Sequence, residues 1–257
     1  MQQPRAILIT GASSGIGEAL ALVYAAPGVF LALLGRDETR LSAVAAACRA
    51  RGADVSICAG DVTHGAGLGA FIETIDQQHP LDLVIANAGV SAGTEGGSES
   101  AAQTRRVLSV NVDGVLNTVL PVLPRMAARR RGQIALMSSL AGFRGFPGSP
   151  TYCASKAMVR IWGEGLRPEL AASGVEVSVI CPGFVTTRMT AVNQFRMPFL
   201  MSADRAARII KHGLARNRAR IAFPWRLYMI VRLLAALPPG VLDPILARLP
   251  RKRAASG

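Results

Sequence analysis

The chain has 257 residues, half of them hydrophobic, and a formal net charge of +13. A chain of this length can bury most of its unfolded surface in one core, so a single domain is the simplest expectation. Its four cysteines form no C-x-x-C pair and lie near no histidine cluster, which argues against a zinc site or a disulfide framework. We therefore expect no bound metal.

The positive charge is unevenly distributed along the chain. Residues 196–257 contain 13 lysines and arginines against two acidic residues, whereas residues 1–195 contain 16 against 14. A basic surface that binds nucleic acid is normally accompanied by a recognisable motif, and none is present here. The basic segment is also apolar, which suits an anionic membrane surface better than a DNA groove. We expect no nucleic-acid partner.

Short apolar runs alternate with helix-like segments rich in alanine, leucine and arginine. No basic stretch with a hydrophobic signal region precedes the first run, so we expect a cytoplasmic protein. The alternation predicts an α/β protein, a Rossmann-type doubly wound parallel sheet with helices on both faces. The predicted strands are residues 6–10, 29–34, 55–59, 81–86, 133–137 and 175–181, and the predicted helices include residues 18–26, 38–51, 154–172 and 203–216.

A glycine-rich segment, TGASSGIG, lies between the first predicted strand and the first predicted helix. Gly11 can turn the chain sharply, Gly15 lets the backbone approach a pyrophosphate, and Gly17 permits close packing of helix on strand. The helix amino terminus would offer unpaired N–H groups and a positive dipole to phosphates. A structural turn is the alternative for three glycines alone, but the strand-turn-helix setting favours a dinucleotide site.

The end of the second predicted strand indicates which dinucleotide is bound. An acidic residue at this place selects NAD, whereas an arginine accommodates the 2′-phosphate of NADP. Arg36 offers a guanidinium here, and the following Asp37 is expected to cap the next helix. We expect NADP(H) to be preferred, with NAD(H) as the alternative.

Tyr152 and Lys156 are four residues apart in a predicted helix, so they share one face. A tyrosine with an ordinary pKa near 10 is a poor base at neutral pH, and a neighbouring ammonium favours the phenolate. The pair is therefore suited to proton transfer, with an ordinary surface pair as the alternative.

Further motifs follow in a family's order and spacing. TGASSGIG, NAG at residues 87–89, Asn111, SSLAG at 138–142, YCASK at 152–156 and PGFVTT at 182–187 together resemble the short, single-domain branch of the short-chain dehydrogenases/reductases. The resemblance covers roughly the first 190 residues. It departs at Ser14, where many NADP-preferring relatives carry a basic residue, so the NADP prediction depends on Arg36 alone.

The resemblance implies hydride transfer between nicotinamide and a carbonyl or alcohol. Ser139 would hydrogen-bond the substrate oxygen, with Ser138 the less favoured candidate. Tyr152 would donate or accept the proton, and Lys156 would hold the nicotinamide ribose and lower the pKa of the tyrosine. Asn111 would anchor a water that links Lys156 to solvent. The implied catalytic residues are Asn111, Ser139, Tyr152 and Lys156.

The resemblance also implies a set of cofactor contacts. Asp61 and Val62 would flank the adenine, residues 87–89 would lie on the adenosine ribose side, and residues 182–187 would reach the nicotinamide amide. The implied cofactor-binding residues are Gly11, Ser13, Ser14, Gly15, Ile16, Gly17, Arg36, Asp61, Val62, Asn87, Ala88, Gly89, Tyr152, Lys156, Pro182, Gly183, Val185 and Thr187.

The remaining chain is predicted to serve the substrate side. Residues 188–202, apolar and rich in methionine, are expected to form a substrate lid, with a loop packed on the core as the alternative. Residues 1–220 would then form the catalytic domain and residues 221–257 a basic, amphipathic C-terminal extension. Arg232 and two prolines interrupt the extension before it reaches the length of a spanning helix. Its aromatic and basic residues suit peripheral contact with an anionic membrane, with a subunit interface as the alternative.

Taken together, these features predict an NADP(H)-dependent oxidoreductase that reduces a bulky hydrophobic ketone, lipid-like or steroid-like, as a homodimer or homotetramer. A sugar derivative is the polar alternative substrate. A non-catalytic dinucleotide sensor and an isomerase or dehydratase are alternative functions. The intact proton relay favours the oxidoreductase, because a sensor has no need of it.

Overall fold

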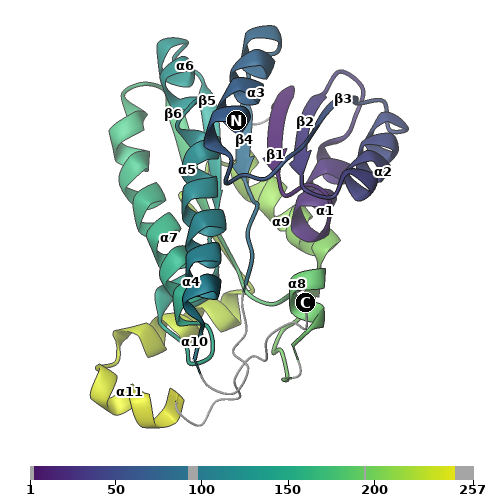
Figure 1. The fold of residues 1–257 in the computed structure, drawn as a ribbon. Helices are drawn as coiled ribbons and strands as arrows, with labels where there is room; N and C mark the ends of the chain where they lie inside the picture. The colour runs from purple at the N-terminus through teal and green to yellow at the C-terminus, as the bar shows by residue number, and fades with distance from the viewer. Residues whose placement is uncertain (1–2, 92–97, 194, 247–257) are drawn as a thin grey trace.

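The computed structural model describes residues 3–91, 98–193 and 195–246. Its centre is a parallel seven-stranded sheet with the strand order β3-β2-β1-β4-β5-β6-β9 (Figure 1). The order reverses between β1 and β4, which is where a doubly wound sheet opens a ligand crevice. The Rossmann-type fold predicted from the sequence is confirmed. The strands are β1 (Ala6–Thr10), β2 (Phe30–Gly35), β3 (Asp54–Ala59), β4 (Leu83–Ala86), β5 (Gly132–Met137), β6 (Val175–Pro182) and β9 (Arg220–Phe223).

Helices cover both faces of the sheet. Successive side chains of a strand point to opposite faces, and in the central strands the side chains on both faces are apolar and buried. In β1, Ile7 and Ile9 belong to one buried cluster, and Ala6 and Leu8 to the other. The first cluster lies under α1 (Gly15–Tyr24), α2 (Glu38–Arg49) and α9 (Ala203–Ala215). The second lies under α3 (Gly65–Gln78), the π-helical turn η1 (Ser109–Asp113), α5 (Gly114–Val119), α6 (Leu123–Ala128) and α7 (Pro150–Ala171). Helix α4 (Ala101–Leu108) leads into η1 and contacts α7.

One helical run within the described residues, 101–128, is long and apolar enough to cross a membrane. It comprises α4, η1, α5 and α6. Val115, Val119 and Met126 in this run are buried in the second core cluster. Packing against the sheet therefore accounts for its apolar character.

Strand β9 is absent from the predicted elements, and the predicted boundary after residue 220 cuts through it. Ile221 and Phe223 are buried in the first core cluster, so they belong to the sheet and not to an extension. A four-residue strand with Arg220 at its start has too weak a pattern to be recognised from sequence. The helices beyond it are α10 (Trp225–Ala236) and α11 (Pro239–Leu246), which lie below the sheet in Figure 1.

The predicted lid is closed at its base by a small sheet. Strand β7 (Val185–Thr186) pairs with β8 (Met201–Ser202), and α8 (Arg188–Ala191) follows β7 directly. Between them, Phe199 and Leu200 are exposed. The pairing of β7 with β8 thus holds the two ends of the predicted lid together.

Candidate active site

The glycine-rich turn between β1 and α1 has the geometry that its glycines predict. Gly11 and Gly15 have φ of +68° and +61°, in the left-handed region that favours glycine. A Cβ on Gly17 would lie 2.1 Å from the Gly11 carbonyl oxygen, so a side chain there has no room. The side chain of Ser14, the N-cap residue, does not cap α1, which leaves the first N–H groups of the helix for a ligand.

Asn87 fixes this turn from the end of β4. Its Nδ2 donates to the carbonyl oxygens of Thr10 at 2.9 Å and Gly11 at 3.3 Å. In return, the Thr10 hydroxyl accepts from the backbone N–H groups of Asn87 and Ala88. The NAG motif therefore holds the glycine turn in place, in addition to facing the cleft.

A cleft of about 750 Å³ lies at the carboxyl ends of the strands, beside the reversal of strand order. Its volume is in the range of small-molecule and cofactor sites. All the catalytic and cofactor-binding residues expected from the sequence line it except two, Gly17 and Asn111. Gly17 lies behind the glycine turn, and Asn111 is fully buried below the cleft.

Two arginines and two aspartates lie at the end of the cleft next to β2 and β3. Asp37 caps α2, accepting from the Arg40 backbone N–H at 2.9 Å, and its other carboxylate oxygen pairs with the Arg40 guanidinium at 3.0 Å. Arg36 lies 3.6 Å from the Asp61 carboxylate and is about half exposed. Burial disfavours ionisation of Asp61, but hydrogen bonds from Thr63 and the charge of Arg36 outweigh it and hold the pKa of Asp61 below its ordinary value.

Tyr152 and Lys156 lie on one face of α7, as their spacing predicts. Lys156 is buried, and its Nζ donates to the Met137 carbonyl oxygen at 2.8 Å. Burial lowers the pKa of Lys156 to about 8. Its Nζ is 5.9 Å from the centre of the Tyr152 ring.

The phenol of Tyr152 differs from the expectation that the lysine lowers its pKa. Burial raises the pKa of Tyr152 above its ordinary value, and the hydrogen bond with Ser139 opposes that rise only in part. Desolvation is therefore the dominant influence on the pKa of Tyr152 in this structure.

The two serines after β5 have different surroundings. Ser138 Oγ donates to the Lys156 carbonyl oxygen at 2.6 Å. This hydrogen bond occupies the Ser138 hydroxyl proton and joins the segment after β5 to α7. Ser139 Oγ accepts from the Ala141 backbone N–H at 3.1 Å, and it donates to the Pro182 carbonyl oxygen over a long distance of 3.4 Å. The same hydroxyl lowers the pKa of the Tyr152 phenol and so opposes the effect of burial on it. Ser139 is therefore the serine available to a substrate oxygen.

Asn111 lies in the π-helical turn η1. Its Oδ1 accepts from the Val90 backbone N–H at 2.8 Å, and its Nδ2 donates to the Val90 carbonyl and the Ser155 hydroxyl. A Cβ on Gly89 would lie 3.2 Å from both Asn111 Oδ1 and Lys156 Nζ, so these two groups flank the same glycine. In this arrangement Asn111 positions the residues after β4 beside Lys156.

Known proteins share this constellation. The family model for short chain dehydrogenase matches residues 5–196. The chain belongs to the short-chain dehydrogenase family. It is 40% identical over 246 residues to an uncharacterised oxidoreductase of Myxococcus xanthus, which covers 95% of this chain and 97% of the relative.

Solved short-chain dehydrogenases extend the similarity to nearly the whole fold. An NADPH complex from Sphingobium yanoikuyae superposes with a TM-score of 0.80 at 28% identity, covering 98% of each chain. An NAD complex from Burkholderia phymatum superposes with a TM-score of 0.82 at 28% identity, covering 97% of each chain. This short-chain dehydrogenase is accordingly an NAD(P)-dependent oxidoreductase that acts on CH–OH or C=O groups. The open glycine turn and the uncapped end of α1 fit the diphosphate of such a cofactor.

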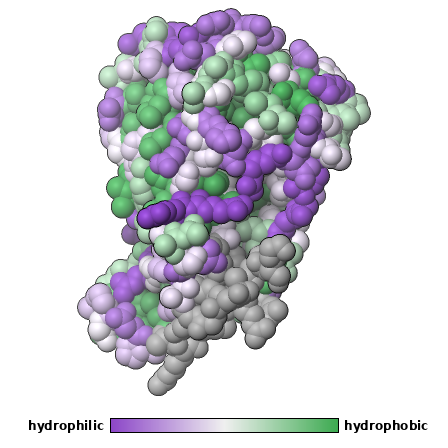
Figure 2. Space-filling model, in the orientation of Figure 1, coloured by the Kyte–Doolittle hydropathy of each residue, from purple (hydrophilic) through white to green (hydrophobic). Residues whose placement is uncertain are grey.

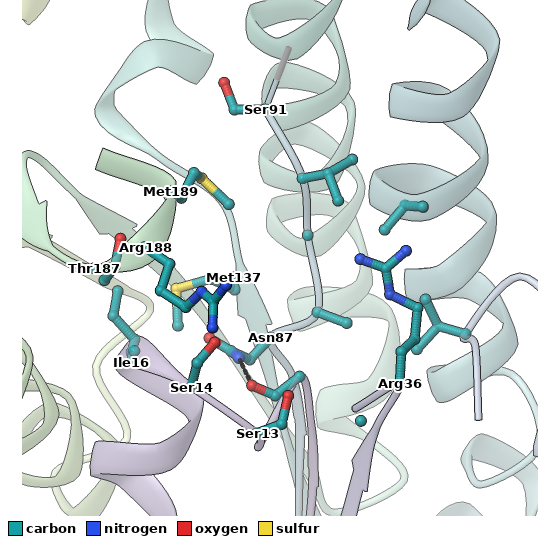
Figure 3. A pocket seen from close by; sticks show the side chains of 18 of the residues that line it. Ser13, Ser14, Ile16, Arg36, Asn87, Ser91, Met137, Thr187, Arg188 and Met189 are labelled. Atoms are coloured by element: carbon teal, nitrogen blue, oxygen red, sulfur yellow. Dashed lines mark hydrogen bonds between the residues drawn. The ribbon is translucent and has the colours of Figure 1, made fainter. Parts of the chain in front are cut away.

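The cleft of this short-chain dehydrogenase also contains residues that were not among the expected catalytic and cofactor-binding residues. Arg188 and Met189 of α8 line it, as do Arg40 and Ser91. In Figure 3 the Arg188 side chain points across the cleft toward the glycine turn. Among the described residues Arg188 has no acidic partner, so its guanidinium adds positive charge to the cleft. In the sequence, the only indication that Arg188 lies at the cleft is its position directly after Thr187.

Proposed function

We propose that this short-chain dehydrogenase uses NADP(H) to reduce the carbonyl group of a bulky hydrophobic substrate. The observation that carries the proposal is the convergence of Ser139, Tyr152 and Lys156 in one cleft with the glycine turn. Ser139 and Tyr152 line the same cleft, where their two hydroxyl groups can both reach the oxygen of a bound carbonyl group. A non-catalytic sensor would need neither the serine nor the tyrosine hydroxyl at this point of the cleft.

In the proposed mechanism, the bound cofactor would supply the hydride, and the protein orients and protonates the carbonyl oxygen of the substrate. Ser139 Oγ–H donates to the carbonyl oxygen and orients it. As negative charge develops on that oxygen, Tyr152 transfers its phenolic proton to it, which yields the alcohol. The phenol of Tyr152 starts protonated, as a proton donor must, because burial holds its pKa above the ordinary value. Lys156, held by Met137, places a positive charge behind the phenolate that remains.

The preference for NADP(H) rests on the end of the cleft next to β2 and β3, where the adenosine of the cofactor would bind. Arg36 is half exposed, and the Asp37 carboxylate caps α2. A 2′-phosphate therefore meets a cation and no free carboxylate from this segment.

We expect Arg36→Ala to weaken NADPH binding by roughly ten-fold to a hundred-fold, because one charge-assisted contact is lost, and to weaken NADH binding far less. Calorimetric titration of both cofactors measures this, with Arg105→Ala, an exposed arginine outside the cleft, as the control. Equal wild-type affinities for NADPH and NADH contradict the assignment.

The proposed substrate is inferred from the lid. Met189 lines the cleft, and Phe184 packs edge-to-face on Phe195 at 6.0 Å between ring centres. With the exposed Phe199 and Leu200, the segment offers apolar side chains to a bulky ligand. Lipid-like and steroid-like ketones are therefore proposed ahead of sugar derivatives.

The experiment for the function is an NADPH oxidation screen over lipid-like, steroid-like and sugar carbonyl compounds. Stoichiometric alcohol formation from an apolar ketone supports the proposal. Turnover confined to sugars overturns the substrate class, and product formation without NADPH consumption indicates an isomerase or dehydratase. Cofactor binding without turnover of any carbonyl indicates a sensor.

We also propose that the protein acts in the cytoplasm as a homodimer or homotetramer, with α10 in reversible contact with anionic membranes. Trp225, Met229 and Leu233 are spaced by four residues and each is more than half exposed. Such spacing forms one apolar stripe on a helix, and Arg226 and Arg232 flank it. In Figure 2 the neighbouring α11, at the lower left, shows both hydrophilic and hydrophobic residues.

A further inference from the structure

A second groove, of about 360 Å³, lies between α9 and β9, the strand at the free edge of the sheet. It shares no lining residue with the active-site cleft. Five of its eight lining residues are arginine or histidine, and none is acidic. The lining residues are Arg205, Arg208, Ile209, His212, Arg218, Arg220, Ile221 and Ala222.

Most of the arginine charge of this basic groove is not neutralised by the protein; the exception is Arg220, which pairs with Glu164. Arg205, Arg208 and His212 project from one face of α9, at spacings of three and four residues. Within the part of the chain that the structure describes, the side chains of Arg205, Arg208 and Arg218 have no acidic partner. Isolated surface arginines are ordinarily solvated, but several like charges facing one concave space repel one another and favour an anion between them.

The edge of the sheet adds neutral donors to the basic groove. The carbonyl oxygens of Ala219 and Phe223 accept from Val179 and Gly183, on the β6 side. In a parallel strand, the residues between such positions direct their N–H and C=O groups away from the neighbour. Arg220 and Ala222, both of which line the groove, therefore turn their backbone N–H groups toward the open edge. Charged residues at a sheet edge can also serve to prevent pairing with a strand of another chain. That alternative role does not require the arginines to gather around one groove.

We propose that the basic groove binds a phosphate group. Guanidinium groups bind phosphate through paired hydrogen bonds, and the edge N–H groups supply further donors to its remaining oxygens. The phosphate can come from a free phosphorylated compound or from the headgroup of an anionic lipid. Trp225, which begins the apolar stripe of α10, follows Ala222 by three residues and so lies within about 11 Å of it. Both sources are compatible with that position.

The test uses the full-length protein saturated with NADP⁺, so that the probe does not enter the active-site cleft. Inorganic phosphate is titrated by calorimetry into the wild type and into Arg205→Gln/Arg208→Gln. The matched control is Arg105→Gln/Arg106→Gln, which removes the same charge from exposed positions on α4. We expect the groove variant to lose at least ten-fold in phosphate affinity, and the control to lose less than two-fold. NADP⁺ affinity is expected to be equal in all three proteins, which separates this site from the proposed function.

A second arm identifies the source of the phosphate. The same proteins are sedimented with phosphatidylcholine vesicles with and without phosphatidic acid. Binding to phosphatidic acid vesicles that is lost only in the groove variant identifies a lipid headgroup, and phosphate binding without vesicle binding identifies a free compound. Equal phosphate affinity in wild type and groove variant, or wild-type binding of polyglutamate but of neither phosphate probe, overturns the proposal.

Discussion

Lys156 is a cation held in the core, and its burial has a cost that can be measured. Its pKa falls from 10.5 to about 8 on folding, so the folded state binds fewer protons than the unfolded state between these values. The contribution of this group to the free energy of unfolding therefore rises with pH across that window, and its full cost is present at pH 7.

We predict that Lys156→Met abolishes turnover but raises the free energy of unfolding at pH 7 by about 1–2 kcal/mol. The gain is the removed cost of burying the charge, less the lost hydrogen bond to Met137. Urea unfolding of both proteins without cofactor, from pH 7 to 10, measures the difference. It should shrink as the pH rises, and a variant less stable than wild type at pH 7 would show that the buried ammonium is stabilising.

Gly17 and Gly165 are both helical glycines with opposite surroundings. A Cβ on Gly17 would meet the Gly11 carbonyl oxygen at 2.1 Å and Asn87 Nδ2 at 2.6 Å, whereas a Cβ on Gly165 would meet nothing within 4 Å. We predict that Gly17→Ala loses about 1–3 kcal/mol of unfolding free energy together with cofactor affinity. Gly165→Ala should gain roughly 0.5–1 kcal/mol and bind cofactor normally. Chemical denaturation measures the free energy of unfolding, and calorimetry measures the cofactor affinity. If Gly17→Ala leaves both unchanged, the predicted steric conflict at Gly17 is wrong.

Among the elements, α7 carries the proton relay and, one turn further on, an ionic network on the same face. Arg160 and Glu164 continue the four-residue spacing of Tyr152 and Lys156. Arg160 Nε donates to the Gly142 carbonyl in the segment after Ser139, at 3.3 Å.

Glu164 joins this helix to β9 and α10. It pairs with Arg160 at 3.1 Å and with Arg220, which also donates to the Tyr228 hydroxyl at 2.9 Å. Both arginines lie over the Phe143 ring, at 4.5 and 5.3 Å from its centre. The carboxylate thus neutralises two guanidinium groups that hold the short helix η2 (Leu140–Phe143) against α7 and α10.

We predict that Glu164→Gln lowers the free energy of unfolding by about 1–3 kcal/mol, because two half-buried guanidinium groups lose their counter-charge. Glu169→Gln, an exposed carboxylate five residues further along α7, should change it by less than 0.5 kcal/mol. Thermal or urea unfolding of both variants is the measurement. Equal effects would mean that the network contributes nothing beyond surface charge.

The elements also show what the sequence can predict. Strands β1 to β6 were recognisable because each is an apolar run between glycine, proline or polar residues. Strand β9 and the small β7–β8 sheet were not, because they are short and their identity depends on pairing with distant strands. In the cleft, motif residues were found through order and spacing. Arg188 and Arg40 were missed because only the folded chain brings them to the glycine turn, and the raised pKa of Tyr152 follows from burial that sequence does not show.

At the scale of the whole molecule, the open question is what faces the apolar stripe of α10. Membrane attachment through the flanking arginines should weaken at high salt, whereas burial in a subunit interface should not. We predict that sedimentation with phosphatidylserine vesicles at low salt captures the wild type, and that Trp225→Ser/Leu233→Ser reduces capture several-fold. Ile161→Ser, an exposed apolar residue on α7, is the control. Wild type that stays in the supernatant at low salt assigns the stripe to a protein contact.

Tyr152 is the proposed proton donor in an NADPH-dependent reduction, and the whole mechanism requires its hydroxyl group. Once the carbonyl screen has provided a substrate, the direct test compares kcat and the NADPH dissociation constant of wild type and Tyr152→Phe. We expect kcat to fall at least a hundred-fold while NADPH affinity changes less than three-fold, because the phenol contributes the proton and little of the cofactor contact. Retention of more than a tenth of wild-type kcat would contradict this role of Tyr152.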